Sequence, residues 1–256
     1  MLKINRVGEQ RRNNHGSLMT IVKYENNKNI TIQFENGYLL ENKNYNDFKN
    51  GKIQYPYDKV AYGVGYIGEG EYTVFIDKKH TLAYKYWYGM LMRCYDKELH
   101  EKEPTYKGCI VCEEWLNFQN FAKWFDENYY EVDGQRMQLD KDILNKGNKL
   151  YSPETCVFVP QRINNLFTKN NKKRGTYPIG VTFEDRRNKF KSSCCIYVNN
   201  KTYNKFLGRF NTPEEAFYRY KEFKEQYIKE VADQYKELIP QTLYEAMYKY
   251  KVDIID

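Results

Sequence analysis

The sequence predicts an α+β fold made of several domains. Alternating apolar residues between positions 18 and 45 are typical of short β-strands, whereas apolar residues three and four apart between 84 and 125 are typical of helices. A second group of strands is predicted between 177 and 210, and a long helix pattern follows it. The length of 256 residues allows one to three domains. We therefore expect strands near both ends, with helices and a small hairpin between them.

Two connecting segments suggest the domain boundaries. Residues 59–82 begin as a Gly-rich connection, whose glycines do not follow the G-x-G-x-x-G pattern of a nucleotide-binding loop. Residues 168–176 (TKNNKKRGT) form a basic, polar linker. The predicted domains are therefore residues 1–58, 59–168 and 169–256.

The composition favours a cytoplasmic protein. The chain has no run of about 18 apolar residues that could span a membrane, and its first residues contain no apolar signal segment. Only one C-x-x-C pair is present, so buried reduced thiols are favoured over a zinc site, the alternative that four of the six cysteines could provide: Cys94, Cys109, Cys112 and Cys156.

Positive charge is concentrated in one part of the chain. The formal net charge is +7, but residues 161–210 contain 12 Lys or Arg and two acids, which is 12 − 2 = +10. The remaining residues therefore sum to 7 − 10 = −3. Such a concentration predicts a nucleic-acid binder. The alternative is a solvated basic face without a ligand.

A hairpin between residues 138 and 167 is the best candidate for a chemical site. Met137–Leu144 is predicted as a strand that carries Asp140 and Asp142, and the apolar run CVFV at 156–159 is a second strand. A helix over Gln161–Phe167 then carries Asn164. Carboxylate and amide oxygens suit Mg²⁺, which needs only one or two protein ligands. The alternative is a structural hairpin whose Asn residues cap turns.

The order Asp140, Asn148, Asn164 resembles the hairpin of His-Asn-His (HNH) endonucleases, above all their phage branch. This resemblance implies a metal-dependent DNA endonuclease or nickase, with Asp140 and Asn164 as Mg²⁺ ligands and Asn148 near the loop Asn. A longer segment that precedes such hairpins in phage proteins is matched here by Trp87, Met90, Arg93, Cys94, Val111, Cys112, Trp115 and Phe118.

The hairpin departs from that family at one position. Lys141 stands where the family has the His that activates water, and the three histidines (His15, His80 and His100) lie outside the hairpin. Lysine acts as a general base only when its pKa is lowered far toward neutrality. The hairpin could therefore bind metal and DNA without cutting.

The N-terminal strands resemble the SH3-like barrel at the front of many phage proteins of this type. The predicted strands are Leu18–Glu25, Asn29–Glu35 and Tyr38–Tyr45, with Asn36-Gly37 as a tight turn. The resemblance implies contact with the DNA backbone or a partner. A purely structural role is the alternative.

The C-terminal segment is predicted as three antiparallel strands and one long helix. The strands are Pro178–Glu184, Lys189–Val198 and Lys201–Phe210. Thr212, Pro213 and Glu215 then give the N-cap, N1 and N3 residues of a helix.

This segment resembles the APETALA-type DNA-binding domain of ethylene-response factors and phage endonucleases. The matching residues are Gly180, Val181, Phe190, Leu207, Gly208, Phe210, Thr212, Glu214, Glu215 and Ala216. The resemblance implies that the sheet enters the major groove of double-stranded DNA. The side chains expected to face DNA are Arg186, Arg187, Lys189, Lys191, Lys201, Lys205 and Arg209.

These observations favour a phage-type DNA-binding protein of the bacterial host cytoplasm with a degenerate HNH-like module. A non-enzymatic DNA-binding regulator is the second interpretation, because the His base is missing. A third is a factor that acts on a host protein, for example by inhibiting a defence system.

Overall fold

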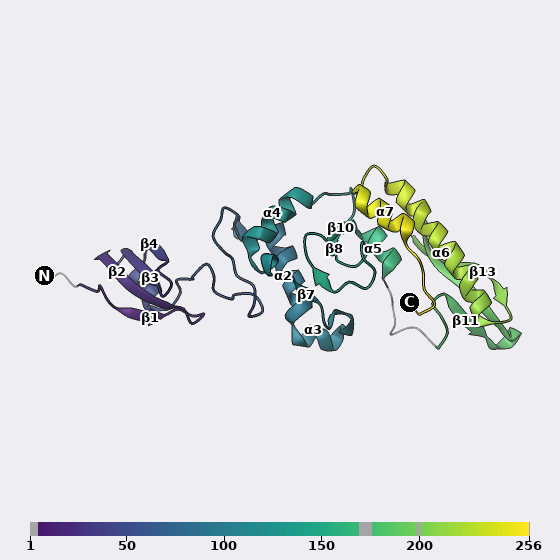
Figure 1. Cartoon of the computed structure of the whole chain (residues 1–256), viewed down its shortest axis with the longest axis horizontal. Coiled ribbons are helices and arrows are strands. Elements are labelled where there is room, and N and C mark those ends of the chain that lie inside the picture. The colour runs from purple at the N-terminus through teal and green to yellow at the C-terminus, as the bar shows by residue number, and fades with distance from the viewer. Residues whose placement is uncertain (1–4, 169–175, 199–200, 256) are drawn as a thin grey trace. The chain divides into compact units, whose positions relative to one another are not determined.

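The computed structural model describes residues 5–168, 176–198 and 201–255. The structure contains both helices and strands, in largely separate groups along the chain, so the mixed α+β class is confirmed (Figure 1). The chain divides into two compact units, Met1–Asn128 with Lys149–Pro153, and Tyr129–Asn148 with Glu154–Asp256. Within the described ranges, no helix combines the length and the apolarity that crossing a bilayer requires.

The first unit begins with a four-stranded antiparallel sheet in the order β1-β2-β3-β4. Its apolar face forms a core of its own around Ile21, Ile32 and Phe48. The sheet is open in the described part of the chain, so the barrel expected from the sequence is not confirmed. The elements are β1 (Gln10–Arg12), β2 (Leu18–Asn26), β3 (Asn29–Phe34), β4 (Leu39–Lys43) and α1 (Tyr45–Lys49).

The helices of the first unit pack around two tryptophans. Trp87 and Trp115 are fully buried, and the indole Nε1 of Trp87 donates to the Trp115 carbonyl oxygen at 2.7 Å. The segment around Trp115, within the predicted helical region 84–125, begins as a 3₁₀ turn, and the chain becomes α-helical only at Phe118. The elements are β5 (Phe75–Ile76), β6 (Lys79–His80), α2 (Leu82–Tyr95), α3 (Lys97–Lys102), η1 (Pro104–Tyr106), β7 (Ile110–Val111), η2 (Glu113–Leu116), α4 (Phe118–Asn128) and β9 (Leu150–Tyr151), which is parallel to β7.

The second unit contains the hairpin. Strand β8 (Met137–Asp140) pairs antiparallel with β10 (Val157–Pro160), and α5 (Gln161–Phe167) follows directly. The first strand was expected to reach Leu144, but it ends at Asp140. The reason is local, because the Asp140 side chain accepts hydrogen bonds from the next backbone amides and turns the chain.

The second unit also contains a three-stranded antiparallel sheet in the order β11-β12-β13. The strands are β11 (Val181–Glu184), β12 (Lys189–Val198) and β13 (Lys201–Phe210), and a 3₁₀ turn η4 (Asp185–Arg187) joins the first two. β11 begins three residues later than predicted. Gly180 has φ +80° and lies against Tyr220, so the chain cannot continue there as a regular strand.

Two helices complete the second unit, α6 (Pro213–Tyr235) and α7 (Gln241–Lys249). α6 begins with the predicted capping box, in which Thr212 and Glu215 exchange side chain–backbone hydrogen bonds. One face of α6 packs on one side of the sheet, through residues that include Ala216, Phe217 and Tyr220.

Candidate functional site

The face of the C-terminal sheet opposite α6 carries three cations. Phe190 and Cys194 of β12 pack in the core under α6, so the alternate residues Lys189 and Lys191 stand on the opposite face. Arg209 is paired directly with Lys191 and therefore shares that face. We call this side the outer face. The register thus brings together residues 20 apart in sequence into one cationic surface.

Glu184 holds part of the outer face in place. Its carboxylate accepts from Arg209 Nε at 2.6 Å and lies 3.9 Å from Arg187 Nε. The hydrogen bond from Arg209 is the main cause that keeps the pKa of Glu184 below its ordinary value. Arg209 also lies over the Phe206 ring, 4.8 Å from its centroid. These contacts orient the guanidinium before any ligand arrives.

The structure separates two of the predicted DNA-facing residues from the others. Lys205 is paired with Cys194, so it stands on the α6 side, where its ammonium lies 4.7 Å from the centroid of the Phe223 ring. Lys201 pairs with Val198 and shares that side. Arg186 and Arg187 are exposed on η4, beside the outer face. A β-bulge near Ser192 and Ser193 changes the alternation on β13, which strand counting from the sequence misses.

Two exposed aromatic rings also belong to the outer face. Tyr197 is on the same alternation of β12 as Lys191, and Phe206 is paired with Ser193. Both are more than a third exposed. Neither ring was among the residues predicted to face DNA. The signal in the sequence that could have indicated them was their position on strands that also carry lysines.

In the hairpin, Asp140 lies at the end of β8 with its carboxylate largely enclosed by protein. Its Oδ1 accepts from the amides of Asp142 at 2.9 Å and Ile143 at 2.8 Å. Burial and the nearby Asp142 carboxylate raise the pKa of Asp140 to about 6, against the lowering effect of the two amides. A hard cation would relieve this crowding of negative charge.

Lys141 and Asn148 organise the loop of the hairpin. The Lys141 side chain is 9% exposed, and its ammonium lies 3.3 Å from the Asp142 carboxylate. The Asn148 side-chain amide donates to the Lys141 carbonyl oxygen at 2.7 Å and closes the loop. Lys141 is therefore a buried, ion-paired lysine at the position where the resemblance implied a His.

Helix α5 packs on β8, but in the described part of the chain no hydrogen bond joins its predicted metal ligand, Asn164, to Asp140. Gln161 accepts from Gln138 Nε2 at 2.7 Å, and Asn164 follows one turn later on the same side of the helix. Gln138 and Asp140 share one face of β8. The described residues contain no group of three His, Cys, Asp or Glu suited to a metal. A cation here would therefore use Asp140 with amide oxygens, which is enough for Mg²⁺.

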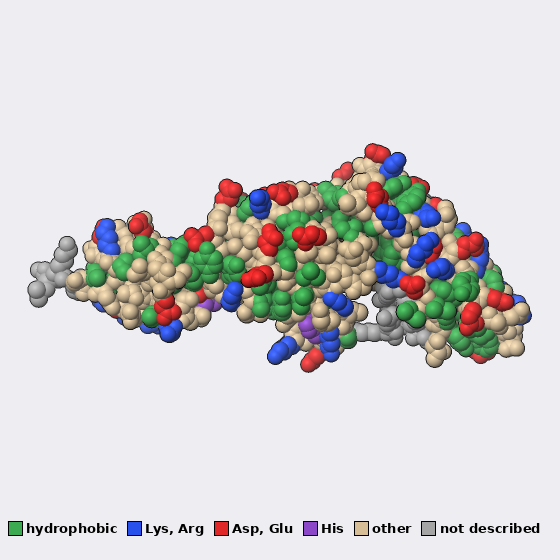
Figure 2. Space-filling model, viewed as in Figure 1, with side chains coloured by type: hydrophobic (Ala, Val, Ile, Leu, Met, Phe, Trp, Pro, Cys, Tyr) green, Lys and Arg blue, Asp and Glu red, His purple; other side chains and the backbone are tan. Residues whose placement is uncertain are grey.

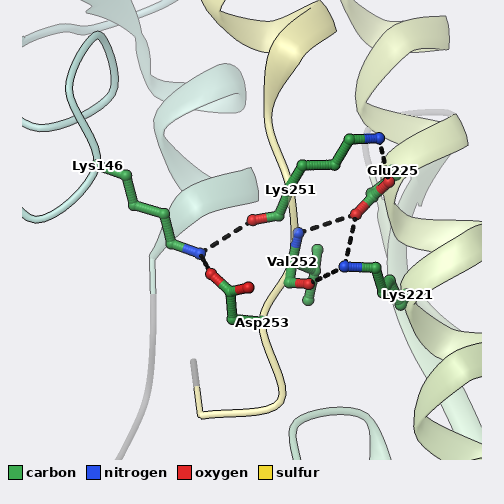
Figure 3. Close-up of polar contacts among 6 residues, drawn as sticks. All are labelled: Lys146, Lys221, Glu225, Lys251, Val252 and Asp253. Atoms are coloured by element: carbon green, nitrogen blue, oxygen red, sulfur yellow. Dashed lines mark hydrogen bonds and ion pairs between the residues drawn. The ribbon is translucent and has the colours of Figure 1, made fainter.

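The C-terminal segment connects the hairpin loop to α6 (Figure 3). The Lys146 ammonium donates to the Lys251 carbonyl oxygen at 2.9 Å and pairs with Asp253. On the other side, Glu225 accepts from the Val252 amide at 3.0 Å and pairs with Lys251 at 2.9 Å. We call residues 250–255 the strap.

Glu225 is the charged anchor of the strap. Burial raises the pKa of this carboxyl, but hydrogen bonds from Lys251, the Val252 amide and Lys221 outweigh burial and hold the pKa below its ordinary value. The side chain is 13% exposed. The strap therefore depends on Glu225 being ionised.

The histidines and the C-x-x-C cysteines lie in the first unit. His100 Nε2 is 2.8 Å from the Arg93 carbonyl oxygen, and His80 stacks on Phe75 with ring centroids 4.2 Å apart. Cys109 is buried and reduced.

No protein-family model, curated protein or solved structure matches this chain significantly.

Proposed function

We propose that the protein binds double-stranded DNA through the outer face of the β11-β12-β13 sheet, as a phage-type factor of the bacterial host cytoplasm. The observation that carries the proposal is the row formed by Lys189, Lys191 and Arg209. A row of cations on a sheet is suited to phosphates, and arginine can also read guanine edges.

The distribution of charge in the second unit supports this choice of surface. The α6 and α7 side carries interspersed acidic and basic side chains (Figure 2), including the ion pair of Arg219 with Glu222 and that of Lys249 with Glu245. Charges paired in this way largely cancel at the distance of a phosphate backbone. On strands β11, β12 and β13, by contrast, Lys and Arg outnumber the single carboxylate, Glu184.

The DNA-binding experiment compares two double variants of equal charge on opposite faces of the same sheet. Lys189→Gln/Lys191→Gln removes two outer-face cations, and Lys201→Gln/Lys205→Gln removes two from the α6 side. We expect the outer-face variant to lower the slope of log affinity against log salt by about 2, since each phosphate contact contributes about 0.9. A titration of labelled duplex at several salt concentrations measures this. Equal slopes for both variants would contradict the outer-face assignment.

We also propose that the hairpin is a degenerate HNH-like module that nicks DNA with Mg²⁺. Asp140 and Asn164 would hold the ion, which would stabilise charge developing on the leaving oxygen. Lys141, as a paired ammonium, would contribute positive charge rather than accept a proton. The N-terminal sheet would be an SH3-like arrangement that contacts the DNA backbone or a partner.

Supercoiled plasmid tests the nuclease proposal. Conversion to nicked circles in Mg²⁺ but not in EDTA is expected, and Asp140→Ala should abolish it while leaving duplex binding unchanged. A salt-sensitive gel shift without nicking would instead favour the non-enzymatic DNA-binding regulator, which the ion-paired lysine at the base position supports. Neither shift nor nicking would point to a protein partner.

A further inference from the structure

The second unit contains a cavity of about 920 Å³ that the sheet and hairpin functions leave unexplained. Its walls come from α5, the edge of the C-terminal sheet, α6 and the strap. The volume is at the upper end of the range for small-molecule sites. Residues of the outer face, among them Cys195, Thr202 and Asn204, form part of the wall. The cavity therefore opens beside the surface proposed to bind DNA.

The cavity wall is cationic. Among the described residues, Arg136, Arg162 and Lys224 line it, against a single acid, Asp133. Lys224 is on α6, where burial lowers the pKa of its ammonium. No carboxylate of the described ranges pairs with Lys224. A partly desolvated ammonium without a counter-ion is suited to an anionic ligand.

Tyrosines and one arginine give the same cavity flat walls. The Arg162 guanidinium lies 5.4 Å from the centroid of the Tyr197 ring and 5.6 Å from that of Tyr235. Its Nη2 donates to Gln234 at 2.8 Å, whereas its buried Nε has no hydrogen-bond partner among the residues that the structure describes. Aromatic rings and guanidinium planes are the surfaces on which nucleobases stack.

An unpaired strand edge supplies main-chain groups to the cavity. β11 pairs with β12 only as far as Ser192. Beyond it, the Ser193 amide donates to the Gly180 carbonyl oxygen at 2.9 Å, and the Tyr197 amide donates to the Tyr227 hydroxyl at 2.9 Å. Cys195 lies between them, and its amide and carbonyl point to the same side of the strand. Within the described residues no strand covers this position.

We propose that this cavity binds a nucleotide, with its base stacked against the wall formed by the tyrosines and the Arg162 guanidinium and its phosphate at Lys224. The main-chain groups of Cys195 are placed to read a base edge. The nucleotide could be free in solution or could be an unpaired nucleotide of bound DNA, and only the second source rests on the proposed DNA-binding function. A peptide strand could also pair with the β12 edge, but three cations and a cluster of tyrosines favour the nucleotide.

The first experiment uses the full chain and deoxyadenosine monophosphate, with deoxyadenosine and inorganic phosphate as partial ligands, in titration calorimetry. We expect the monophosphate to bind more tightly than either part. Lys224→Met should weaken it about tenfold or more, because the variant loses a charged hydrogen-bond donor to the phosphate. Lys224→Arg keeps the charge and should keep binding, which separates loss of the ligand contact from loss of folding.

Lys229→Met is the matched control on the same helix. Lys229 lies 5.9 Å from the centroid of the Tyr248 ring and is not part of the cavity wall. The affinity of the Lys229→Met variant for the monophosphate should equal that of the unchanged protein. Equal affinities of the Lys224→Met and Lys229→Met variants, or no binding of the monophosphate by the unchanged protein, would overturn the proposal. The β12 edge would then remain for a peptide strand.

A second experiment distinguishes the two sources of the nucleotide. Binding is compared for a fully paired duplex and for the same duplex with one unpaired adenosine. If the ligand is part of DNA, the unpaired adenosine should raise the affinity, and Lys224→Met should remove only this increase. If the protein binds the monophosphate but shows no preference for the duplex with the unpaired adenosine, the ligand is a free nucleotide. If the protein binds the nucleotide but not the duplex, the proposed nucleotide site stands and the proposed DNA-binding function is refuted.

Discussion

The hairpin and the C-terminal sheet hold their charged groups in opposite ways. Asp140 and Lys141 are enclosed, and backbone amides and a neighbouring carboxylate fix them. Lys189, Lys191 and Arg209 are more accessible, and the strand register places them. The ionisation of an enclosed side chain depends on its nearest neighbours, whereas the positions of side chains in a row on a sheet depend on the register of the whole sheet. This difference suits the hairpin to chemistry at one atom and the sheet to a long, repetitive ligand.

The largest difference in stability loss between the two regions should come from replacing a glycine by alanine. A Cβ on Gly180 would lie 2.1 Å from the Tyr220 ring, whereas a Cβ on Gly147 in the hairpin loop would meet nothing, and both glycines have positive φ. Gly180→Ala should therefore destabilise by about 2–4 kcal/mol, against about 1 kcal/mol for Gly147→Ala. Urea unfolding measures both. Equal losses would mean that the Gly180 contact relaxes without cost.

The two neighbouring asparagines of α5 test the metal assignment. Asn165 accepts from Gln161 Nε2 at 2.7 Å and lines the cavity, whereas Asn164 is not part of the described cavity wall. Asn164→Ala should lower Mg²⁺-dependent nicking about tenfold or more, the usual cost of removing support from a metal site. Asn165→Ala is the control and should retain nicking. The reverse order would place the metal elsewhere.

Acid should loosen the strap, because Glu225 must be ionised to hold it. Because the folded-state pKa of Glu225 is below its ordinary value, its ionisation stabilises the protein above the unfolded-state pKa, and this contribution is lost as pH falls through the folded-state pKa. Glu225→Gln should cost about 1 kcal/mol at pH 7 and progressively less toward pH 3. Thermal melting at several pH values checks this. A cost independent of pH would show that Glu225 acts without its charge.

The smallest expected effect is at Glu184, the carboxylate among the outer-face cations. Glu184→Gln should tighten duplex binding about threefold, because it frees Arg209 and removes a negative charge from a surface proposed to face phosphates. The exposed Glu214→Gln, on α6, is the control and should change little. Duplex titration at one salt concentration compares them. Weaker binding by Glu184→Gln would mean that Arg209 needs its partner for orientation.

Local sequence signals predicted the helices and strands better than they predicted the site. The strands Lys189–Val198 and Lys201–Phe210, and the capping box at Thr212, follow from alternation and cap chemistry, which act over a few residues. The strand that ends early at Asp140 was missed because a side chain–backbone bond competes with strand pairing.

Contacts between distant residues were the part that could not be predicted. The side of the sheet on which Lys205 stands depends on a bulge. The cavity around Lys224 and Arg162 requires segments far apart in sequence to meet, and no local pattern reports this. The assignments of Asp140, Lys141, Asn148 and Asn164 to metal chemistry stay predictions.

The strap has a consequence for the time course of synthesis. Lys146 receives its carbonyl partner from a residue 105 positions later in the chain. At a translation rate of about 5–20 residues per second, the hairpin leaves the ribosome about 5–20 s before the strap exists. During that interval the hairpin can form, since its strands are close in sequence, but its loop lacks the contacts with the strap. Slowing translation between positions 150 and 250 should therefore lengthen the time during which the hairpin exists without the strap.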